Sequence, residues 1–291
     1  MYIDRRGRRN EQRGTTRTGG NAAQRIITTC IFLLVGAAAA AAPQAELWPR
    51  WEAHDASSTE TVDHSAWADF LDQYLITDHP SGVNRVAYGD VSRADRRSLQ
   101  SYLEGLQGIS VSDLNRDEQL AYWINLYNAA TVELILDNHP VDSIRDIGEG
   151  RFSRGPWDDE LLRVEGEVLT LNDVEHRIIR PIWQDARIHY VVNCAGIGCP
   201  NLYPEPLTAD NWRRIFEESA ADYITHPRGM RFEGNRLVLS EIYNWYVTDF
   251  GDSLDGVVSH LEGYVDTETA ERLRDFDGRV RYEYDWSLNE P

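Results

Sequence analysis

A segment of sixteen residues near the middle of the chain contains most of the side chains that could carry chemistry. It reads RIHYVVNCAGIGCPNL over residues 187–202 and includes His189, Cys194 and Cys199. A thiol that a neighbouring histidine deprotonates is a nucleophile, able to attack the carbonyl carbon of an amide. Two cysteines this close in the chain can instead form a disulfide, which removes both thiols. The two outcomes correspond to different functions.

A carboxylate is expected close to these residues. The spacing of apolar residues predicts a helix over about 171–180, which ends before Pro181. On that helix Glu175 lies in the middle of the apolar face, and His176 lies on its flank. Because burying a carboxylate without a partner is unfavourable, Glu175 is expected to contact a histidine or an arginine.

The residues that precede the cysteines have the pattern of a strand. Apolar side chains occupy every second position of 188–192, and the glycines and proline of 196–200 cannot continue the strand. In a straight strand, His189 and Cys194 would point to opposite faces, because they are five positions apart.

Three arrangements would remove this conflict. The strand could break at Asn193, Cys194 could pair with His176, or Cys199 could return over His189. We expect the break at Asn193, with Cys194 as the nucleophile.

The N-terminal half is predicted to be helical, because apolar residues recur at intervals of three and four. The three stripes lie over residues 67–75, 99–106 and 120–135. The third helix has a capping pair, Asn115 and Glu118, and is expected to end before Pro140. Asn125 and Asn128 lie beside its apolar face, where a buried amide usually fastens a loop.

The remaining chain is predicted to mix helices and strands. Segment 141–168 has no periodic pattern and is expected to cover one side of the site. The elements expected after residue 202 are a helix over 210–224, a hairpin over 230–239 turning at Gly234-Asn235, a helix from Ser240 to Gly251, and a strand over 279–284. The fold class is therefore α+β, with a helical N-terminal part packed on a small, mainly antiparallel sheet.

The first 45 residues differ from the rest. Seven arginines precede an apolar run over 26–42, which is shorter than the ~20 residues that a membrane span needs. This layout predicts a secretory signal peptide over 1–45, cleaved between Ala39 and Ala45; an uncleaved single-span anchor is the alternative. Residues 46–64 are expected to form a linker, and 65–291 a single domain. Loss of the signal peptide would leave two cysteines in an oxidising compartment, which favours a disulfide.

The charge of the chain excludes some partners. It has 29 basic residues, all arginine, and 48 acidic residues, for a net charge of −19. Seven of the arginines and two of the acids lie in residues 1–45, so the exported protein would have a net charge of −24. A protein this acidic repels nucleic acid and anionic membrane surfaces, so neither is an expected partner.

Several motifs resemble those of one family. The chain resembles the bacterial domain of unknown function 547 family from about residue 65 to the end, in motifs that occur in the family's order. These are AYWINLYNAATVELIL (121–136), SIRDIG (143–148), LNDVEH (171–176), RIHYVVNCAGIGCPNL (187–202) and YDWSLN (284–289). The resemblance implies a papain-like fold, in the papain order of elements or a permutation of it, and a catalytic cysteine, histidine and glutamate.

Carried onto this chain, the implied catalytic residues are Cys194 or Cys199, His189 or His176, and Glu175. The function would be an exported thiol hydrolase or transferase acting on amide bonds of a peptide or of the cell envelope. Cys194 would be the nucleophile, His189 the base and Glu175 the group that orients the base.

Two other readings remain open. In the first, the protein is a non-catalytic envelope protein whose Cys194–Cys199 disulfide holds the loop. In the second, His176, His189 and the two cysteines bind zinc, but they lack the short paired spacing of structural zinc sites. No metal or other cofactor is therefore expected, and contact with a membrane is expected only through the signal peptide.

The signal peptide gives a first testable prediction. When the full chain is expressed in a secreting bacterium, the protein of the envelope fraction should begin between residues 40 and 46, because signal peptidases cleave after small residues. Intact-mass measurement and N-terminal sequencing check this. Recovery of envelope protein that still carries Met1 would show that the segment is an anchor.

Overall fold

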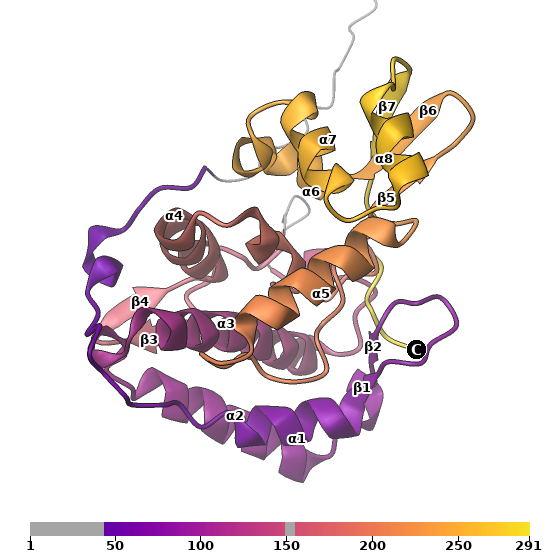
Figure 1. Cartoon of the computed structure of the whole chain (residues 1–291). Helices are drawn as coiled ribbons and strands as arrows, with labels where there is room; N and C mark the ends of the chain where they lie inside the picture. The colour runs from indigo at the N-terminus through magenta and orange to yellow at the C-terminus, as the bar shows by residue number, and fades with distance from the viewer. Residues whose placement is uncertain (1–43, 149–154) are drawn as a thin grey trace, which may run out of the picture. The chain divides into compact units, whose positions relative to one another are not determined.

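The helices of the first half of the chain pack against one another. The computed structural model describes residues 44–148 and 155–291, so nearly all of the predicted signal peptide lies outside it. Figure 1 shows α1 (Ser65–Tyr74), α2 (Arg93–Gln107) and α3 (Arg116–Asn138) side by side. All three helices were expected from the apolar spacing. Within the described ranges, no helix is both long and apolar enough to cross a membrane.

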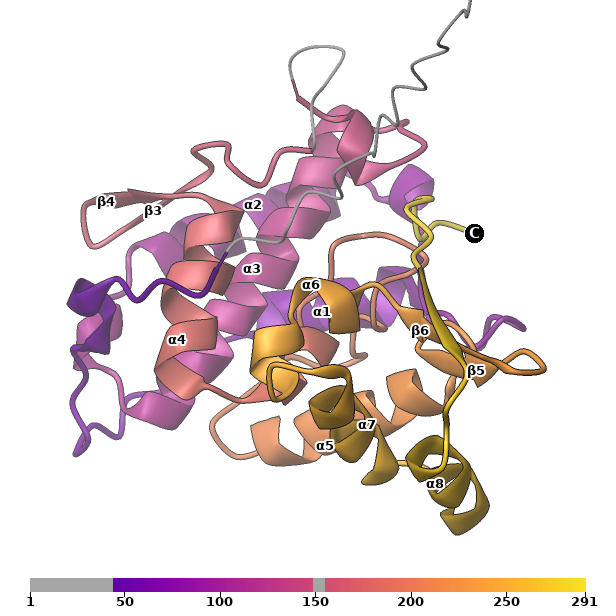
Figure 2. The same cartoon turned by 90° about the horizontal axis from the view of Figure 1, so that it is seen from above.

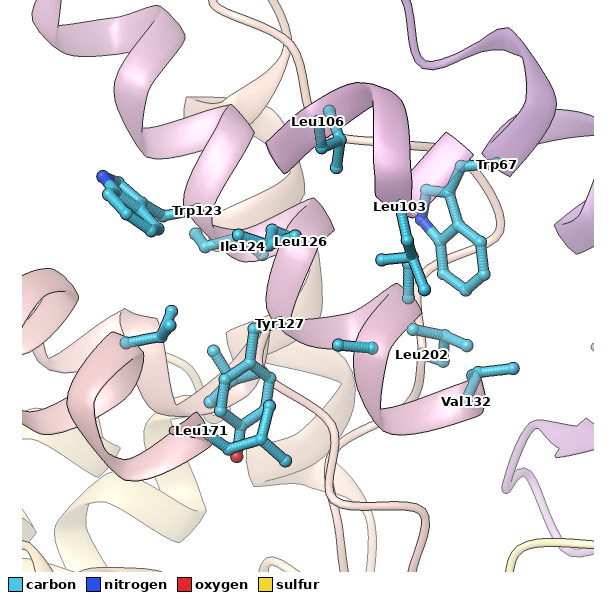
Figure 3. Packing of buried hydrophobic residues seen from close by; sticks show 14 of the residues in the cluster. Trp67, Leu103, Leu106, Trp123, Ile124, Leu126, Tyr127, Val132, Leu171 and Leu202 are labelled. Carbon is cyan, nitrogen blue, oxygen red and sulfur yellow. The ribbon is translucent and has the colours of Figure 1, made fainter. Parts of the chain in front are cut away.

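The third helix, α3, is buried on almost every side. It begins where the sequence predicts, since the Asn115 side chain accepts the backbone N–H of Glu118. The Glu118 carboxylate accepts the N–H of Val62 at 2.6 Å. Figure 3 shows Trp67 and Leu103 packing on one side of α3, and Tyr127 beside Leu171 on the other. Burial on both sides makes α3 the centre of the larger of two apolar cores.

The strands of residues 44–148 and 155–291 are short and form three separate sheets. Their bounds are β1 Leu75–Ile76, β2 Arg85–Val86, β3 Leu162–Val164, β4 Glu167–Leu169, β5 Met230–Phe232, β6 Arg236–Ser240 and β7 Arg279–Glu283. The β1–β2, β3–β4 and β5–β6 pairs are antiparallel, and β7 joins β6 in parallel. The α+β class, the 230–239 hairpin and the C-terminal strand are confirmed.

The end of segment 141–168 is more regular than predicted. The β3–β4 hairpin begins within it and ends at Leu169, and Figure 2 shows this hairpin and the β5–β6 hairpin on opposite sides of the helices. Glu165 and Gly166 have φ values of 47° and 87°, which suit a two-residue turn between twisted strands. The sequence LRVEGEVL does alternate around Glu-Gly, and this signal was missed.

The last quarter of the chain builds the smaller core. α5 (Trp212–Thr225), α6 (Ile242–Trp245), α7 (Leu254–Glu262) and α8 (Thr267–Arg274) pack with β5, β6 and β7. A 3-10 helix over Val247–Phe250 follows α6, and Gly251 ends it with a φ of 95°. Neither α7 nor α8 was expected from the sequence, although Ser253 and Asp266 cap them as expected of such residues.

The strand predicted over 188–192 is wrong. Ala186–Tyr190 is a 3-10 helix. Its side chains face two cores at once, because Ile188 packs in the larger core and Tyr190 in the smaller one. The alternating apolar residues of this segment therefore contact the two cores without belonging to a sheet, since no neighbouring strand offers backbone partners there within the described residues.

The helix predicted to end before Pro181 also continues further. Asp173–Ile179 is a π-helix, and α4 (Arg180–Trp183) follows it through Pro181. Proline has no N–H, so the carbonyl four residues earlier loses its helical donor. Here the N–H of Trp48 donates to the Arg177 carbonyl at 3.0 Å, and that of Glu46 donates to the His176 carbonyl at 2.9 Å. The N-terminal segment therefore completes this helix.

The segment predicted as a linker is thus packed on the fold. Trp51, in the 3-10 helix Pro49–Glu52, is 3% exposed, and its ring lies 5.1 Å from that of Trp123. Replacing a buried tryptophan with alanine leaves a cavity.

Trp51→Ala should lower the free energy of unfolding by about 3–5 kcal/mol because of the lost packing. Urea unfolding followed by far-UV circular dichroism measures the change. Leu47→Ala is the matched control, since Leu47 is exposed and its loss should change stability by less than about 0.5 kcal/mol. Equal stability of Trp51→Ala and Leu47→Ala would show that residues 46–52 do not support the fold.

Candidate functional site

Buried amides fasten the loop that carries the cysteines. Asn128 on α3 donates to the carbonyl of Val191 and accepts the N–H of Asn193, at 2.9 and 2.8 Å. Asn193 in turn donates to the carbonyl of Pro200 and accepts the N–H of Ala195. The loop 193–200 therefore has its backbone satisfied by side chains, as the sequence predicted for Asn128.

The C-terminal residues hold the same loop from the other side. The N–H groups of Ile197 and Gly198 donate to the carbonyls of Ser287 and Asp285, at 2.8 and 2.7 Å. A Cβ at Gly198 would lie 2.8 Å from the backbone nitrogen of Asp285, so this close approach requires glycine. The terminal motif 284–289 is thus a structural partner of the cysteine loop.

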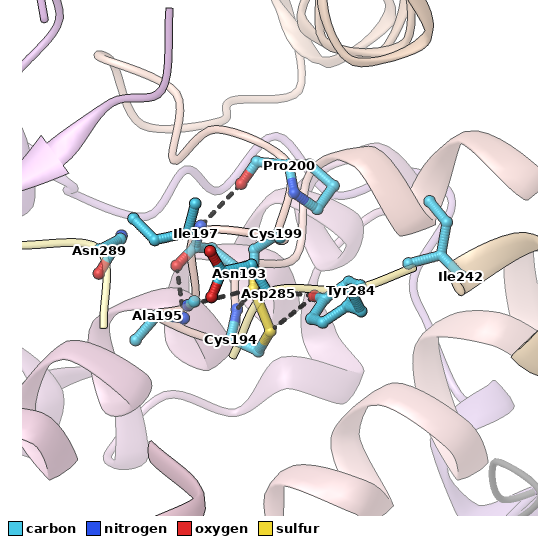
Figure 4. Close-up of a disulfide and its surroundings, with 12 residues drawn as sticks. Asn193, Cys194, Ala195, Ile197, Cys199, Pro200, Ile242, Tyr284, Asp285 and Asn289 are labelled. Carbon is cyan, nitrogen blue, oxygen red and sulfur yellow. Dashed lines mark hydrogen bonds between the residues drawn. A yellow bond between two sulfur atoms is a disulfide. The ribbon is translucent and has the colours of Figure 1, made fainter. Parts of the chain in front are cut away.

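Cys194 and Cys199 form a disulfide, with their Cα atoms 6.1 Å apart. Figure 4 shows the Tyr284 side chain directed at the two sulfurs. The Tyr284 hydroxyl lies 3.1 Å from each Sγ. Cys199 is 1% exposed, whereas Cys194 is half-buried. The disulfide is the outcome that the alternative reading predicted, and in this form neither cysteine has a free thiol.

A cluster of charged side chains lies in the interior. The π-helix and α4 supply Glu175, His176 and Arg180, the 3-10 helix 186–190 supplies His189, and the 3-10 helix after α6 supplies Asp249. All except Asp249 are 5% exposed or less. The predicted contact of Glu175 with a histidine is confirmed: its Oε1 lies 3.7 Å from His176 Nδ1 and 3.9 Å from His189 Nδ1.

Each ring nitrogen of His189 faces a carboxylate. Nε2 lies 2.7 Å from Asp249 Oδ2, and Nδ1 faces Glu175. The ring stacks on Tyr246, with centroids 4.0 Å apart and 13° between the planes. Asp249 also accepts from Arg180 Nε at 2.7 Å. These contacts fix both the position and the orientation of the imidazole.

The charges in the cluster shift one another's pKa values. Burial opposes ionisation of Glu175, but His176, His189 and Arg180 together hold the pKa of Glu175 below its usual value. Burial, assisted by the Arg180 charge, lowers the pKa of His176. His176 is therefore neutral at pH 7, and its Nδ1 accepts from Arg180 Nη1 at 3.0 Å.

One tyrosine hydroxyl contacts the charged cluster and another contacts the disulfide. Tyr127 donates to Glu175 Oε2 at 3.0 Å. Burial first, and then the Tyr223, Tyr246 and Glu175 charges, raise the pKa of Tyr284, which contacts both sulfurs. Tyr284 therefore lies within electrostatic reach of Glu175, although in the described residues the sulfurs contact the Tyr284 hydroxyl and no histidine.

The structure brings Glu175, His176 and His189 together, as predicted, and places the cysteines beside Tyr284. Asp249 and Tyr284 were missed because each contacts the site across 60 residues or more of sequence. Asp249 followed a predicted helix, and Tyr284 opened a motif already noted, but neither spacing indicated the contact. In the part of the chain that the structure describes, no group of three or more His, Cys, Asp or Glu side chains could hold a metal ion.

The ion pairs of Asp249 predict a pH dependence of stability. Burial opposes its ionisation, but hydrogen bonds from His189 and Arg180 hold the pKa of Asp249 well below its unfolded value of about 4. Because the folded pKa is depressed, the stabilisation is complete above the unfolded pKa and is lost as pH falls toward the folded pKa.

Asp249→Asn should therefore lower the free energy of unfolding at pH 7 by about 1–3 kcal/mol, between the values for exposed and buried pairs. The difference from the wild type should begin to shrink below about pH 4. Urea unfolding at pH 7, 5 and 3 measures it. Asp277→Asn, at an exposed carboxylate, is the control. A difference that stays constant over this range would contradict the depressed pKa.

Comparison with known proteins identifies part of the chain. Residues 111–224 match the family described as "Protein of unknown function, DUF547". The matched segment contains Glu175, His189 and both cysteines, while Asp249 and Tyr284 lie beyond it. No curated protein and no solved structure matches the chain. The similarity to this family of proteins of unknown function therefore covers residues 111–224, which is less than half of the chain.

Proposed function

We propose that this protein is an exported thiol hydrolase or transferase that acts on amide bonds in the cell envelope. Cys194 is the nucleophile, His189 is the base, and Glu175 orients the base, in a papain-like arrangement. The observation that carries the proposal is the contact of His189 with Glu175, on the 3-10 helix that ends four residues before Cys194. Asp249 faces the other nitrogen of His189, so one of the two carboxylate contacts must open before the imidazole can take the proton of Cys194.

Donors for a developing negative charge lie beside the sulfurs. The Tyr284 hydroxyl is 3.1 Å from Cys194 Sγ, and the N–H of Gly196 points at Cys199 Sγ from 3.3 Å. When the Cys194 thiolate adds to an amide carbonyl, these groups are placed to donate to the oxyanion. The amine leaves with the proton that His189 holds. Water then hydrolyses the thioester, or a second amine takes the acyl group.

The disulfide is the oxidised resting form in this proposal. An oxidising compartment, which the predicted signal peptide implies, favours the bonded pair. Reduction releases the Cys194 side chain to rotate about its Cα–Cβ bond toward His189, while the amides of Asn128 and Asn193 keep the loop in place. Activity therefore requires a reductant.

A second candidate is a non-catalytic envelope protein. The observation that favours it is the disulfide itself, since it leaves His189 bound to Asp249 and not to a sulfur. In this case the charged cluster stabilises the fold, and reduction exposes no activated thiol. The same experiment separates the two candidates.

The thiol-hydrolase proposal predicts an activated Cys194. A thiol paired with a histidine ionises well below the ~8.5 of free cysteine, so iodoacetamide at pH 6 should label Cys194 of the reduced protein about tenfold faster than an ordinary thiol. Cys199 should react more slowly because it is 1% exposed. Peptide mass mapping over time measures both rates.

His189→Ala should remove this advantage and lower any amidase activity at least about a hundredfold, as loss of a general base does. His260→Ala is the matched control, because His260 pairs with Tyr190 outside the charged cluster. Preferential labelling of Cys199 would transfer the nucleophile role to it. Slow labelling of both cysteines, unchanged by His189→Ala or His176→Ala, would favour the non-catalytic protein.

A further inference from the structure

The two sulfurs of the disulfide have different surroundings. Three donors point at Cys199 Sγ: the N–H of Cys194 at 3.2 Å, the N–H of Gly196 at 3.3 Å and the Tyr284 hydroxyl at 3.1 Å. Cys194 Sγ has the Tyr284 hydroxyl alone among the described residues. Hydrogen bonds of this kind are weak to a bonded sulfur and strong to a thiolate. The surroundings of Cys199 therefore suit a thiolate better than a disulfide sulfur.

Access to the two sulfurs is also unequal. Cys199 is 1% exposed, so an external thiol cannot approach it, whereas Cys194 is half-buried. A thiolate that attacks a disulfide must reach one sulfur and displace the other. Only Cys194 can be attacked, and Cys199 is then the leaving group. The accessible sulfur and the stabilised leaving group are thus on opposite ends of the same bond.

A positive charge binds the backbone of the cysteine loop. Arg228 is largely buried; its Nη1 donates to the carbonyl of Ile197 and its Nη2 to Asn201 Oδ1, at 3.4 and 2.8 Å. Burial raises the pKa of Tyr284, and the positive charge of Arg228 offsets part of this rise. The Asp285 carboxylate is turned to the N–H of Ser287 at 2.9 Å.

We propose that the Cys194–Cys199 pair carries out thiol–disulfide exchange as a second activity. The thiolate of a small thiol attacks Cys194 Sγ, forming a mixed disulfide, and the electron pair of the broken S–S bond leaves with Cys199 as a thiolate. A second thiolate attacks the thiol's sulfur in the mixed disulfide and releases Cys194. In total, two thiols are oxidised to one disulfide and the protein gains two electrons and two protons. This activity does not require amide hydrolysis.

Glutathione is a suitable probe, because its adduct is identified by mass. The mature oxidised protein should react with glutathione at least about tenfold faster than the same protein unfolded in urea, since a stabilised thiolate leaves faster. In Cys199→Ser, oxidised glutathione should give a stable adduct at Cys194. An adduct at Cys199 of the wild type, or a folded protein that reacts no faster than the unfolded one, would overturn the proposal.

Tyr284→Phe tests the leaving group directly. Loss of one hydrogen bond to the thiolate should slow the reaction roughly three- to tenfold. Tyr282→Phe is the matched control, because this half-buried tyrosine of β7 has no hydrogen bond to either sulfur among the described residues. Equal rates for the two variants would contradict the assigned leaving group. Because the rate is measured from disulfide exchange and not from cleavage of an amide bond, the result is independent of whether the protein proves to be a hydrolase.

Discussion

The fold depends on compensating the charges that it buries. Glu175, Arg180 and His189 are each 5% exposed or less, and an unpaired buried ion destabilises a protein by several kcal/mol, roughly. A continuous series of contacts pairs these side chains: Glu175 faces His189, His189 binds Asp249, and Asp249 binds Arg180. Each contact joins two different elements, so pairing the charges also brings those elements together. The histidine that the proposed chemistry needs is held in place by the same contacts that stabilise the core.

A different constraint governs the cysteine loop. It belongs to no helix or sheet, so side chains and the chain end must satisfy its backbone. Asn128, Asn193 and the carbonyls of Asp285 and Ser287 bind part of this backbone, and the N–H groups of Cys194 and Gly196 donate to Cys199 Sγ. The loop therefore has its own support, and breaking the S–S bond removes one cross-link of several. A disulfide that is not needed to hold its loop is free to take part in chemistry.

Sequence reasoning succeeded where a local pattern decides the structure. Apolar spacing located the main helices, and the position of Glu175 on its apolar face predicted its contact with a histidine. It failed where distant groups override the local pattern. The backbone of Glu46 and Trp48 carries the helix through Pro181, and packing in two separate cores accompanies a 3-10 helix over 186–190 in place of the predicted strand. No spacing within a single sequence indicates that residues 46–48 donate hydrogen bonds to the end of this helix, or that Asp249 contacts His189.

The two proposed chemistries use Cys194 in opposite roles. In the disulfide its sulfur is the electrophile that an external thiolate attacks; after reduction it is the nucleophile that attacks an amide. The two proposed reactions share hydrogen-bond donors. The Gly196 N–H and the Tyr284 hydroxyl, which donate to Cys199 Sγ, are also the groups that would stabilise an oxyanion. One molecule cannot use them for both at once. The redox state of the pair therefore decides which reaction a given molecule can perform, and thiol exchange is the step that converts the resting form into the hydrolytic one.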